Sequence, residues 1–334
     1  MLPEPETNAA YAKYQAMRRK DQVFELFYKY GLYIVLAALI IAFSQFNQNF
    51  VSQDNIMNIL RQTASTGIAA AGLVFVMVTG GIDVSMGSII YMTAVIAATL
   101  ANSGMGLLGA FAVSLLSGAA VGAVNGIFIA KLKVAPLIVT LAMLYVIRGL
   151  SISVVGIKPI FFNNDVGAIL TKTYLFGFLP VIVVVLIVVM AVSQLLLTKS
   201  VWGRQLFAIG NNRQAAEVLG IKVNRNVFFS YLVCGAFAGL SGLISGVQVG
   251  GIPPIFAQGT EFIIICAVVL GGVSLFGGRG SAFPGAFIGV VIIMVIENGL
   301  VMARANMYMY TVVRGIVIFA AVYLNSVQNK GELR

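Results

Sequence analysis

Long apolar runs recur from residue 31 to residue 325 of this chain and leave little polar sequence between them. Only 10% of the residues are charged, whereas a soluble domain carries about 25%. A soluble fold of this length would lack the polar surface to cover itself. Because a bilayer core of roughly 30 Å takes about 20 apolar residues per helix, the runs predict a polytopic membrane protein.

The runs predict an all-α fold with about ten transmembrane helices. Residues 1–30 are expected to form an N-terminal tail, 31–325 the transmembrane domain with a loop at 198–225, and 326–334 a C-terminal tail. The expected spans are 31–47, 63–80, 87–103, 107–130, 134–154, 174–197, 226–249, 262–278, 282–302 and 309–325.

The net charge of +10 is better explained by topology than by nucleic-acid binding, because the basic residues form no face with interleaved aromatic side chains. If the basic N-terminal tail is cytoplasmic, most loop Lys and Arg residues also fall inside. The outer loops then hold only Arg61, Lys158, Lys172 and Arg304. This bias favours an even number of spans with both ends in the cytoplasm.

The composition argues against several kinds of active site. The chain has no histidine, which excludes a zinc site or a proton relay built on that residue. Cys234 and Cys266 lie in apolar runs and are expected to be small packing residues. No stretch fits the phosphate-binding pattern GxxxxGK[ST], and we expect no catalytic residue and no metal ligand in this chain.

The predicted inner loop at 198–225 contains the signals of a short helix. Asn211 or Asn212 can cap its start, and Asn211 with Gln214 resembles a capping box. Gly220 is a natural stop, so a helix of about two turns is expected over 212–219.

Two faces of this short helix can be distinguished. Arg213 and Glu217 can pair at i and i+4. A second face carries Asn212, Ala215, Ala216 and Leu219. A helix this short is marginal alone in water. It therefore either docks another protein with its small residues and Leu219, or lies flat on its own membrane domain.

Two glycine-containing turns echo one another. Residues 78–82 with 87–88 resemble residues 269–273 with 280–281. The echo indicates either duplicated machinery, as in many transporters, or chance in a chain with 36 glycines.

Ionisable residues at membrane depth are costly and call for a functional hypothesis. Asp83 is expected either to cap the turn into the 87–103 helix or to contribute to a gate. A second group maps to the outer third of the spans, where it would snorkel and pair, or form a polar rim at an outer mouth together with Arg61. Its members are Arg148, Glu261, Glu297, Arg304 and Arg314.

Three motifs in order make the chain similar to the bacterial ABC-type monosaccharide import permeases, which carry ribose, xylose, arabinose or galactosides. The first is TGGIDVSMGS at 79–88, the second is the 203–221 stretch and the third is LGGVS at 270–274 followed by GGRG at 277–280. Val84 and Met86 replace the family's usual Leu and Val, which are mild changes. With the ten-span pattern, the resemblance covers nearly the whole chain beyond residue 30.

The resemblance implies a permease subunit in the bacterial cytoplasmic (inner) membrane, paired with a second copy or a sister permease. ABC ATPase subunits would bind ATP and Mg and dock at the 198–225 loop, while an external sugar-binding protein would deliver the solute. The implied ATPase-coupling residues are Gly203, Arg204, Gly210, Asn211, Asn212, Ala215, Ala216, Glu217, Leu219 and Gly220. The implied turn and gating residues are Gly80, Gly81, Asp83, Ser85, Gly87, Gly271, Gly272, Gly277, Gly278 and Arg279.

Other classes fit less well. A proton-coupled secondary transporter would favour several carboxylates or histidines at mid-depth, and a membrane enzyme would need a clustered nucleophile, base or metal site. Permeases for nucleosides or branched-chain amino acids carry signatures less like GGIDVSMGS. Within the sugar class the sequence does not name the sugar, but a neutral solute would need hydrogen-bonding side chains. Candidates are Asn47, Asn125, Thr140, Gln248 and Asn298.

Overall fold

The computed structural model describes residues 30–162 and 165–306, together with residues 309, 312–313, 315–316 and 319. The first half of the chain forms a helix at Tyr30–Phe46, η1 Gln48–Val51, α2 Gln53–Met77, α3 Met86–Asn102, α4 Leu107–Gly126, η2 Ile127–Lys131, α5 Pro136–Val155 and α6 Asp165–Lys172. The second half forms α7 Val181–Lys199, α8 Val201–Asn211, α9 Arg213–Val218, α10 Val223–Val249, α11 Thr260–Leu270, η3 Ala282–Ala286 and α12 Phe287–Met302.

Four very short strands accompany the helices. β1 Ile160–Phe161 pairs with β4 Gly251–Ile252, and β2 Tyr174–Leu175 pairs with β3 Leu179–Pro180, both antiparallel. The prediction of a helical, multi-span protein is therefore confirmed in its coarse form.

Six helices of the described chain are long and apolar enough to cross a membrane. They are Gln53–Met77, Leu107–Lys131, Pro136–Val155, Val181–Lys199, Val223–Val249 and Ala282–Met302. Three shorter apolar helices are Tyr30–Phe46, Met86–Asn102 and Thr260–Leu270. The predicted span 309–325 and both tails lie largely outside the described residues.

Three predicted boundaries were wrong, each for a local reason. The predicted 63–80 span begins earlier as α2, because Ser52 caps the helix by accepting a hydrogen bond from the Asn55 amide. The predicted 174–197 span begins only at Val181, because the preceding residues form the β2–β3 hairpin. The predicted 262–278 span stops at Leu270, because two glycines follow and Gly272 has a positive φ of 84°.

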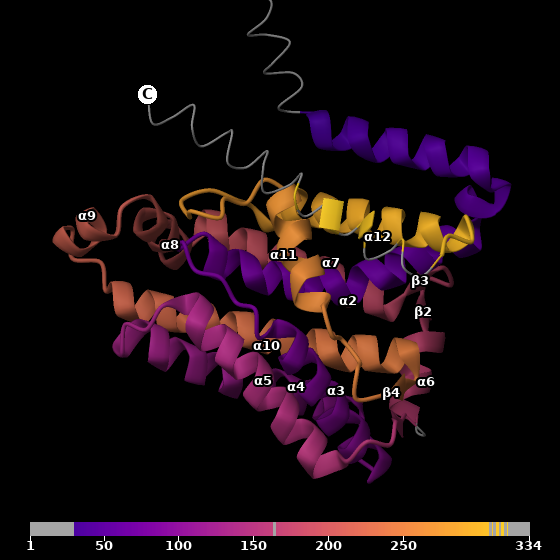
Figure 1. Ribbon diagram of the computed structural model, residues 1–334, viewed down its shortest axis with the longest axis horizontal. Helices are drawn as coiled ribbons and strands as arrows, with labels where there is room; N and C mark the ends of the chain where they lie inside the picture. Colours follow the sequence, from indigo (N-terminus) through magenta and orange to yellow (C-terminus); the bar gives the residue numbers. More distant parts are fainter. Residues whose placement is uncertain are drawn as a thin grey trace, which may run out of the picture.

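α10 is the central helix, and small residues let its backbone approach α4 closely (Figure 1). A Cβ at Gly239 would overlap the Ser114 carbonyl oxygen, and a Cβ at Gly122 would overlap the Tyr231 carbonyl oxygen. Lipid chains are as apolar as leucine, so helices in a membrane associate largely through such close packing. α2 and α3 pack against other parts of α10.

The connection between α2 and α3 does not stay at the end of the bundle. Figure 1 shows it leaving α2 and running back toward the middle of the molecule, where α3 begins. The Tyr231 hydroxyl of α10 donates to the Ile82 carbonyl of this connection over 3.2 Å. α3 therefore spans only part of the bundle's length, and its N-terminus lies in the interior.

The two ends of the molecule differ. α8 and α9 project at one end, while α6 and the short strands lie at the opposite end (Figure 1). Near α6, Arg61 donates to the Tyr174 hydroxyl and the Asn102 side chain donates to the Phe161 carbonyl. We refer to these ends as the α9 end and the α6 end.

The α4–α10 contact predicts that a Gly→Ala substitution, which usually stabilises a helix, will here destabilise the protein. Alanine favours a helix interior over glycine by about 1 kcal/mol. We nevertheless expect Gly239→Ala to destabilise the protein by about 1–3 kcal/mol, because the added methyl group collides with Ser114 backbone. Gly149→Ala on α5 is the control, because nothing lies within 4 Å of a Cβ there. Thermal unfolding in detergent measures both, and equal unfolding temperatures for the two variants would contradict this packing.

Candidate functional site

The three glycine motifs meet at the α9 end of α2. The Gly278 amide donates to the Val78 carbonyl over 2.9 Å. A Cβ at Gly80 would lie 3.3 Å from the Phe276 carbonyl oxygen, and a Cβ at Gly277 would lie 2.7 Å from the Gly80 amide. The end of α2, which carries the first of the two echoing turns, is thus in direct backbone contact with residues 276–278, between the two parts of the second. This contact neither requires nor excludes a duplication.

Gly210 of α8 completes this contact, which we call the glycine junction (Gly80, Gly210, Gly277 and Gly278). A Cβ at Gly210 would overlap the Val78 carbonyl oxygen and the Gly278 amide. Gly277 and Gly278 also have positive φ angles of 90° and 76°. A side chain at Gly210 would separate α8 from the end of α2, and one at Gly278 would collide with Asn211 of α8.

α8 is a full helix that the sequence analysis treated as loop. Its N-cap is Ser200, whose hydroxyl oxygen accepts a hydrogen bond from the Gly203 amide over 2.9 Å. The signal was present in the sequence, since Ser is a favoured cap residue. Gly203 lies against the end of α7, where a Cβ would overlap the carbonyl oxygens of Leu196 and Leu197.

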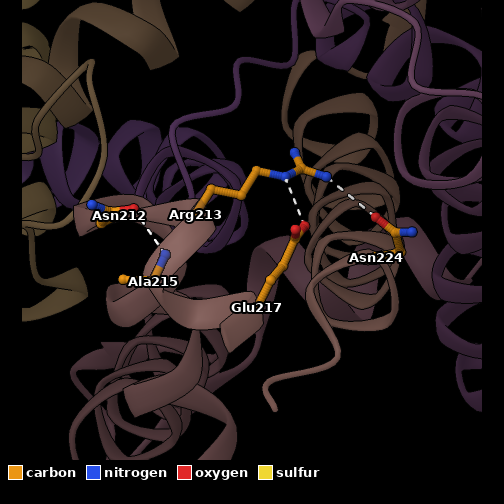
Figure 2. Close-up of polar contacts among 5 residues, drawn as sticks. All are labelled: Asn212, Arg213, Ala215, Glu217 and Asn224. Carbon is orange, nitrogen blue, oxygen red and sulfur yellow. Dashed lines mark hydrogen bonds and ion pairs between the residues drawn. The ribbon is translucent and has the colours of Figure 1, made fainter. Parts of the chain in front are cut away.

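α9 begins at a capped residue and is tied to α10 by Arg213 (Figure 2). Asn212 is its cap and accepts from the Ala215 amide over 3.0 Å, so the capping box built on Asn211 was wrong. Figure 2 shows Arg213 reaching between Glu217, at 3.6 Å, and Asn224 at the start of α10, at 3.2 Å. The predicted pair of Arg213 and Glu217 is confirmed.

The predicted docking face of α9 is exposed except at Ala216. Ala216 is only 2% exposed, because this side of α9 packs against the chain's own domain. Val218 and Leu219 are 88% and 78% exposed, and Gly220 ends the segment with a φ of 77°. The prediction that Ala216 presents a docking surface was therefore wrong. The short helix lies on its own domain and still exposes two large apolar side chains.

Asp83 is fully buried in the connection before α3. One carboxylate oxygen accepts from the Ser85 amide over 2.9 Å and from the Ser85 hydroxyl over 2.6 Å. Asn125 of α4 donates to the same hydroxyl over 2.9 Å. These bonds fix the turn into α3 and tie it to α4. Asp83 Oδ2 and Asn125 Oδ1 are buried acceptors with no hydrogen-bond donor.

Arg148 and Glu261 lie together beside the start of α3. The Arg148 guanidinium donates to the Pro254 and Phe256 carbonyls over 2.9 and 3.1 Å, and its carbon lies 5.0 Å from the centre of the Tyr91 ring. The buried Glu261 carboxylate accepts from the Gly259 amide and lies against Gly87, where a Cβ would overlap it.

The predicted polar rim is therefore wrong for Arg148 and Glu261. Both side chains lie beside Gly87, in the first turn of α3, whereas this helix reaches the α6 end only at Asn102. Fifteen residues, or about 22 Å of helix, separate Gly87 from Asn102, so both side chains lie far from the α6 end. Arg61, in contrast, contacts Tyr174 at the α6 end. The remaining members of that group are placed separately: Glu297 lies on α12, Arg304 follows α12, and Arg314 lies outside the described residues.

The sequence analysis missed a cavity of about 280 Å³ that is lined by residues of α2, α3, α10, α11 and α12 and of the segment before α11. Of the pathway candidates only Gln248 lines it, whereas Asn125 lies beside Ser85. The signal was the spacing of polar residues along α10. The lining residues are Gln62, Ser65, Thr66, Ile90, Ser241, Ser245, Gln248, Val249, Phe256, Ala257, Thr260, Ile263, Met294 and Glu297. Among the described residues, no group of three or more Cys, Asp or Glu side chains could hold a metal ion.

Comparison with known proteins gives a consistent result. A family model described as "Branched-chain amino acid transport system / permease component" matches residues 55–322. The ribose import permease protein RbsC of Bacillus subtilis is 37% identical over 89% of this chain and 92% of its own length. The D-allose transport system permease protein AlsC of Escherichia coli is 31% identical over 95% of this chain and 98% of its own length.

A third relative, the L-arabinose transport system permease protein AraH of Escherichia coli, is 32% identical over 91% of this chain and 92% of its own length. No solved structure matches the chain.

The geometry around Asp83 predicts that it forms the turn into α3 and that its charge is not needed for a gate. Asp83→Asn keeps the acceptor for Ser85 and adds a donor beside Asn125, so we expect unchanged stability. Asp83→Ala leaves the buried Ser85 amide without a partner and should destabilise the protein by about 1–3 kcal/mol. Thermal unfolding in detergent distinguishes them. If Asn damages transport as severely as Ala while the protein stays folded, the negative charge itself is required and the turn-forming role is insufficient.

Proposed function

The chain belongs to the family of permease components described by the branched-chain amino acid transport model, and on that premise we propose that it is the membrane-spanning permease subunit of a binding-protein-dependent ABC importer for a monosaccharide. The observation that carries the proposal is the similarity to the ribose, allose and arabinose permeases over nearly their whole length. Each of those proteins is named for a different single sugar. The similarity therefore supports the class of solute without choosing the sugar.

The description of the family model supports one alternative, a permease for branched-chain amino acids. Two features favour a sugar. Three relatives that match over more than 90% of their own length are named for sugars, and the signature TGGIDVSMGS at 79–88 resembles that of the sugar permeases.

We place the ATPase at the α9 end. The chain contains no phosphate-binding loop pattern, so energy would come from separate subunits that bind ATP and Mg. Val218 and Leu219 project from α9, and exposed large apolar side chains are suited to a cleft on another protein. The backbone contact between Gly210 and Val78 would pass a displacement of α8 directly to the end of α2.

The proposed topology has ten spans with both termini in the cytoplasm. The α9 end is then cytoplasmic, and the α6 end faces an external sugar-binding protein. A second copy or a sister permease completes the transport pathway. The distribution of basic residues supports this orientation, because Arg204, Arg213, Lys222 and Arg225 all belong to the α9 end.

Reconstitution tests the proposed function. The permease is placed in proteoliposomes with its ATPase and binding protein, and ATP hydrolysis and uptake are measured with D-ribose, D-allose, L-arabinose and L-leucine. We expect one or more sugars to stimulate both activities and L-leucine to stimulate neither. If L-leucine is taken up and none of the sugars is, the solute is an amino acid and not a monosaccharide. Uptake driven by an ion gradient without nucleotide would reject the ABC assignment.

The exposed face of α9 gives a second test. Val218→Asp and Leu219→Asp should lower solute-stimulated ATP hydrolysis at least about tenfold, the effect of losing 1.4 kcal/mol or more of interface energy. Both residues are exposed, so the unfolding temperature should not change. Leu219→Met preserves an apolar contact and is the control, whereas Ala216→Arg should lower stability itself because Ala216 is buried. If both Asp variants bind the ATPase normally, α9 is not part of the docking site.

A further inference from the structure

The described bundle holds a cavity between α2, α10, α11 and α12 whose polar lining the proposed function does not yet explain. We propose that it is a binding site for a neutral polyhydroxylated solute of about one sugar ring, a proposal that rests on the proposed function. Its volume of about 280 Å³ is at the small end of ligand pockets.

Two polar stripes face one another across this cavity. Ser241, Ser245 and Gln248 follow one face of α10 at the spacing of a helical repeat. On α2, Gln62 precedes Ser65 and Thr66. Polar side chains are costly inside a membrane and generally mark solute pathways. Two such stripes in apolar helices are therefore better explained by a polar occupant than by packing.

The hydrogen bonds of the serines leave acceptors available to that occupant. Ser241 donates to the Ser65 carbonyl over 2.8 Å, and Ser245 donates to the Ser241 carbonyl over 2.7 Å. Each hydroxyl has thus used its single proton and can only accept from a ligand. Gln248 donates to the Arg61 carbonyl over 2.6 Å, which leaves its side-chain oxygen as a further acceptor.

Donors to the ligand come from the other wall. Within the described part of the chain, the Gln62 side chain makes no hydrogen bond although it is exposed, so its amide can both donate and accept. Sugar hydroxyls also do both. The mixture of acceptors on α10 and a free amide on α2 thus matches a ring that carries several hydroxyl groups.

The charge of the lining argues against an amino acid. Glu297 is its one charged side chain, and none of the described lining residues is Lys or Arg. A zwitterionic solute would bring a carboxylate into the membrane without a cationic partner, which is unfavourable. A neutral solute avoids that cost, and Phe256 with Ile263 offers apolar surface for the less polar face of a sugar ring.

The floor of the cavity is held by Arg148 and lies beside the buried Glu261. Phe256, Ala257 and Thr260 line it. Arg148 donates to the Phe256 carbonyl, and Ala257 lies against Gly87 of α3. This floor separates the cavity from the turn at Asp83 and would stop a solute that enters from the α6 end.

Cysteine labelling tests the site directly in the reconstituted transporter. Both natural cysteines are buried, so background labelling should be low. We expect Ser245→Cys to react with a membrane-impermeant maleimide added outside, and the transported sugar, but not L-leucine, to slow the reaction at least about fivefold. Ser117→Cys is the matched control, because Ser117 and Ser245 are both part-buried and both donate over 2.7 Å to a carbonyl four residues earlier. Sugar should not alter labelling of Ser117→Cys.

A transport measurement complements the labelling. Gln62→Leu removes the free amide from the cavity, and we expect it to lower the amount of sugar moved per ATP hydrolysed by roughly fivefold. Hydrolysis stimulated by the loaded binding protein should persist, since α9 is unchanged. Ser117→Ala should leave the ratio of sugar to ATP unaltered.

The outcomes separate this inference from the proposed function. If no sugar stimulates the unaltered transporter, the proposed function fails. If sugar stimulates it but Ser245→Cys reacts only with a lipid-soluble reagent, or reacts equally with and without sugar, the cavity does not bind the solute. An unaltered ratio of sugar to ATP in Gln62→Leu would overturn the proposal in the same way.

Discussion

The architecture depends on backbone contacts that only glycine permits. At the glycine junction, the Gly278 amide bonds the Val78 carbonyl, and Gly210 has no space for a Cβ between them. A lipid environment offers little hydrophobic drive between helices, so close approach and hydrogen bonds must hold elements together. This junction joins α8 to both α2 and the segment after α11. It also explains why three motifs far apart in sequence share a glycine-rich character.

A continuous series of contacts leads from this junction to the cavity. The connection between α2 and α3 runs from Val78 to the buried turn at Asp83 and Ser85. α3 then begins, and Gly87 in its first turn lies against Glu261 and Ala257. The series consists of backbone contacts at the junction, buried hydrogen bonds at Asp83 and Ser85, and the packing of Gly87 against Glu261 and Ala257.

The sequence predicted what depends on local chemistry and failed where distant segments meet. The apolar runs located most helices, and Asn212, Arg213 and Glu217 behave as their spacing indicated. The interior start of α3 was not predictable, because hydropathy does not report that a chain folds back into the bundle. The error at Ala216 has the same origin: helical spacing defines which residues share a face, but only tertiary packing decides that Ala216 is buried while Ala215 and Leu219 of that face stay exposed. The cavity is lined by residues of five helices, so the spacing of polar residues along α10 was a partial signal that could not locate it.

The interior start of α3 also explains how the buried Glu261 and the half-buried Arg148 are accommodated at that depth. Glu261 lies in the first turn of α11 and against the first turn of α3, so its carboxylate faces the N-termini of two helices. Helix N-termini carry partial positive charge from their unpaired amides. Arg148 interacts electrostatically with Glu261 and satisfies carbonyls of the irregular segment before α11. Irregular backbone is tolerated inside a membrane protein only where its polar groups are paired or line a cavity, and the 254–260 segment meets both conditions.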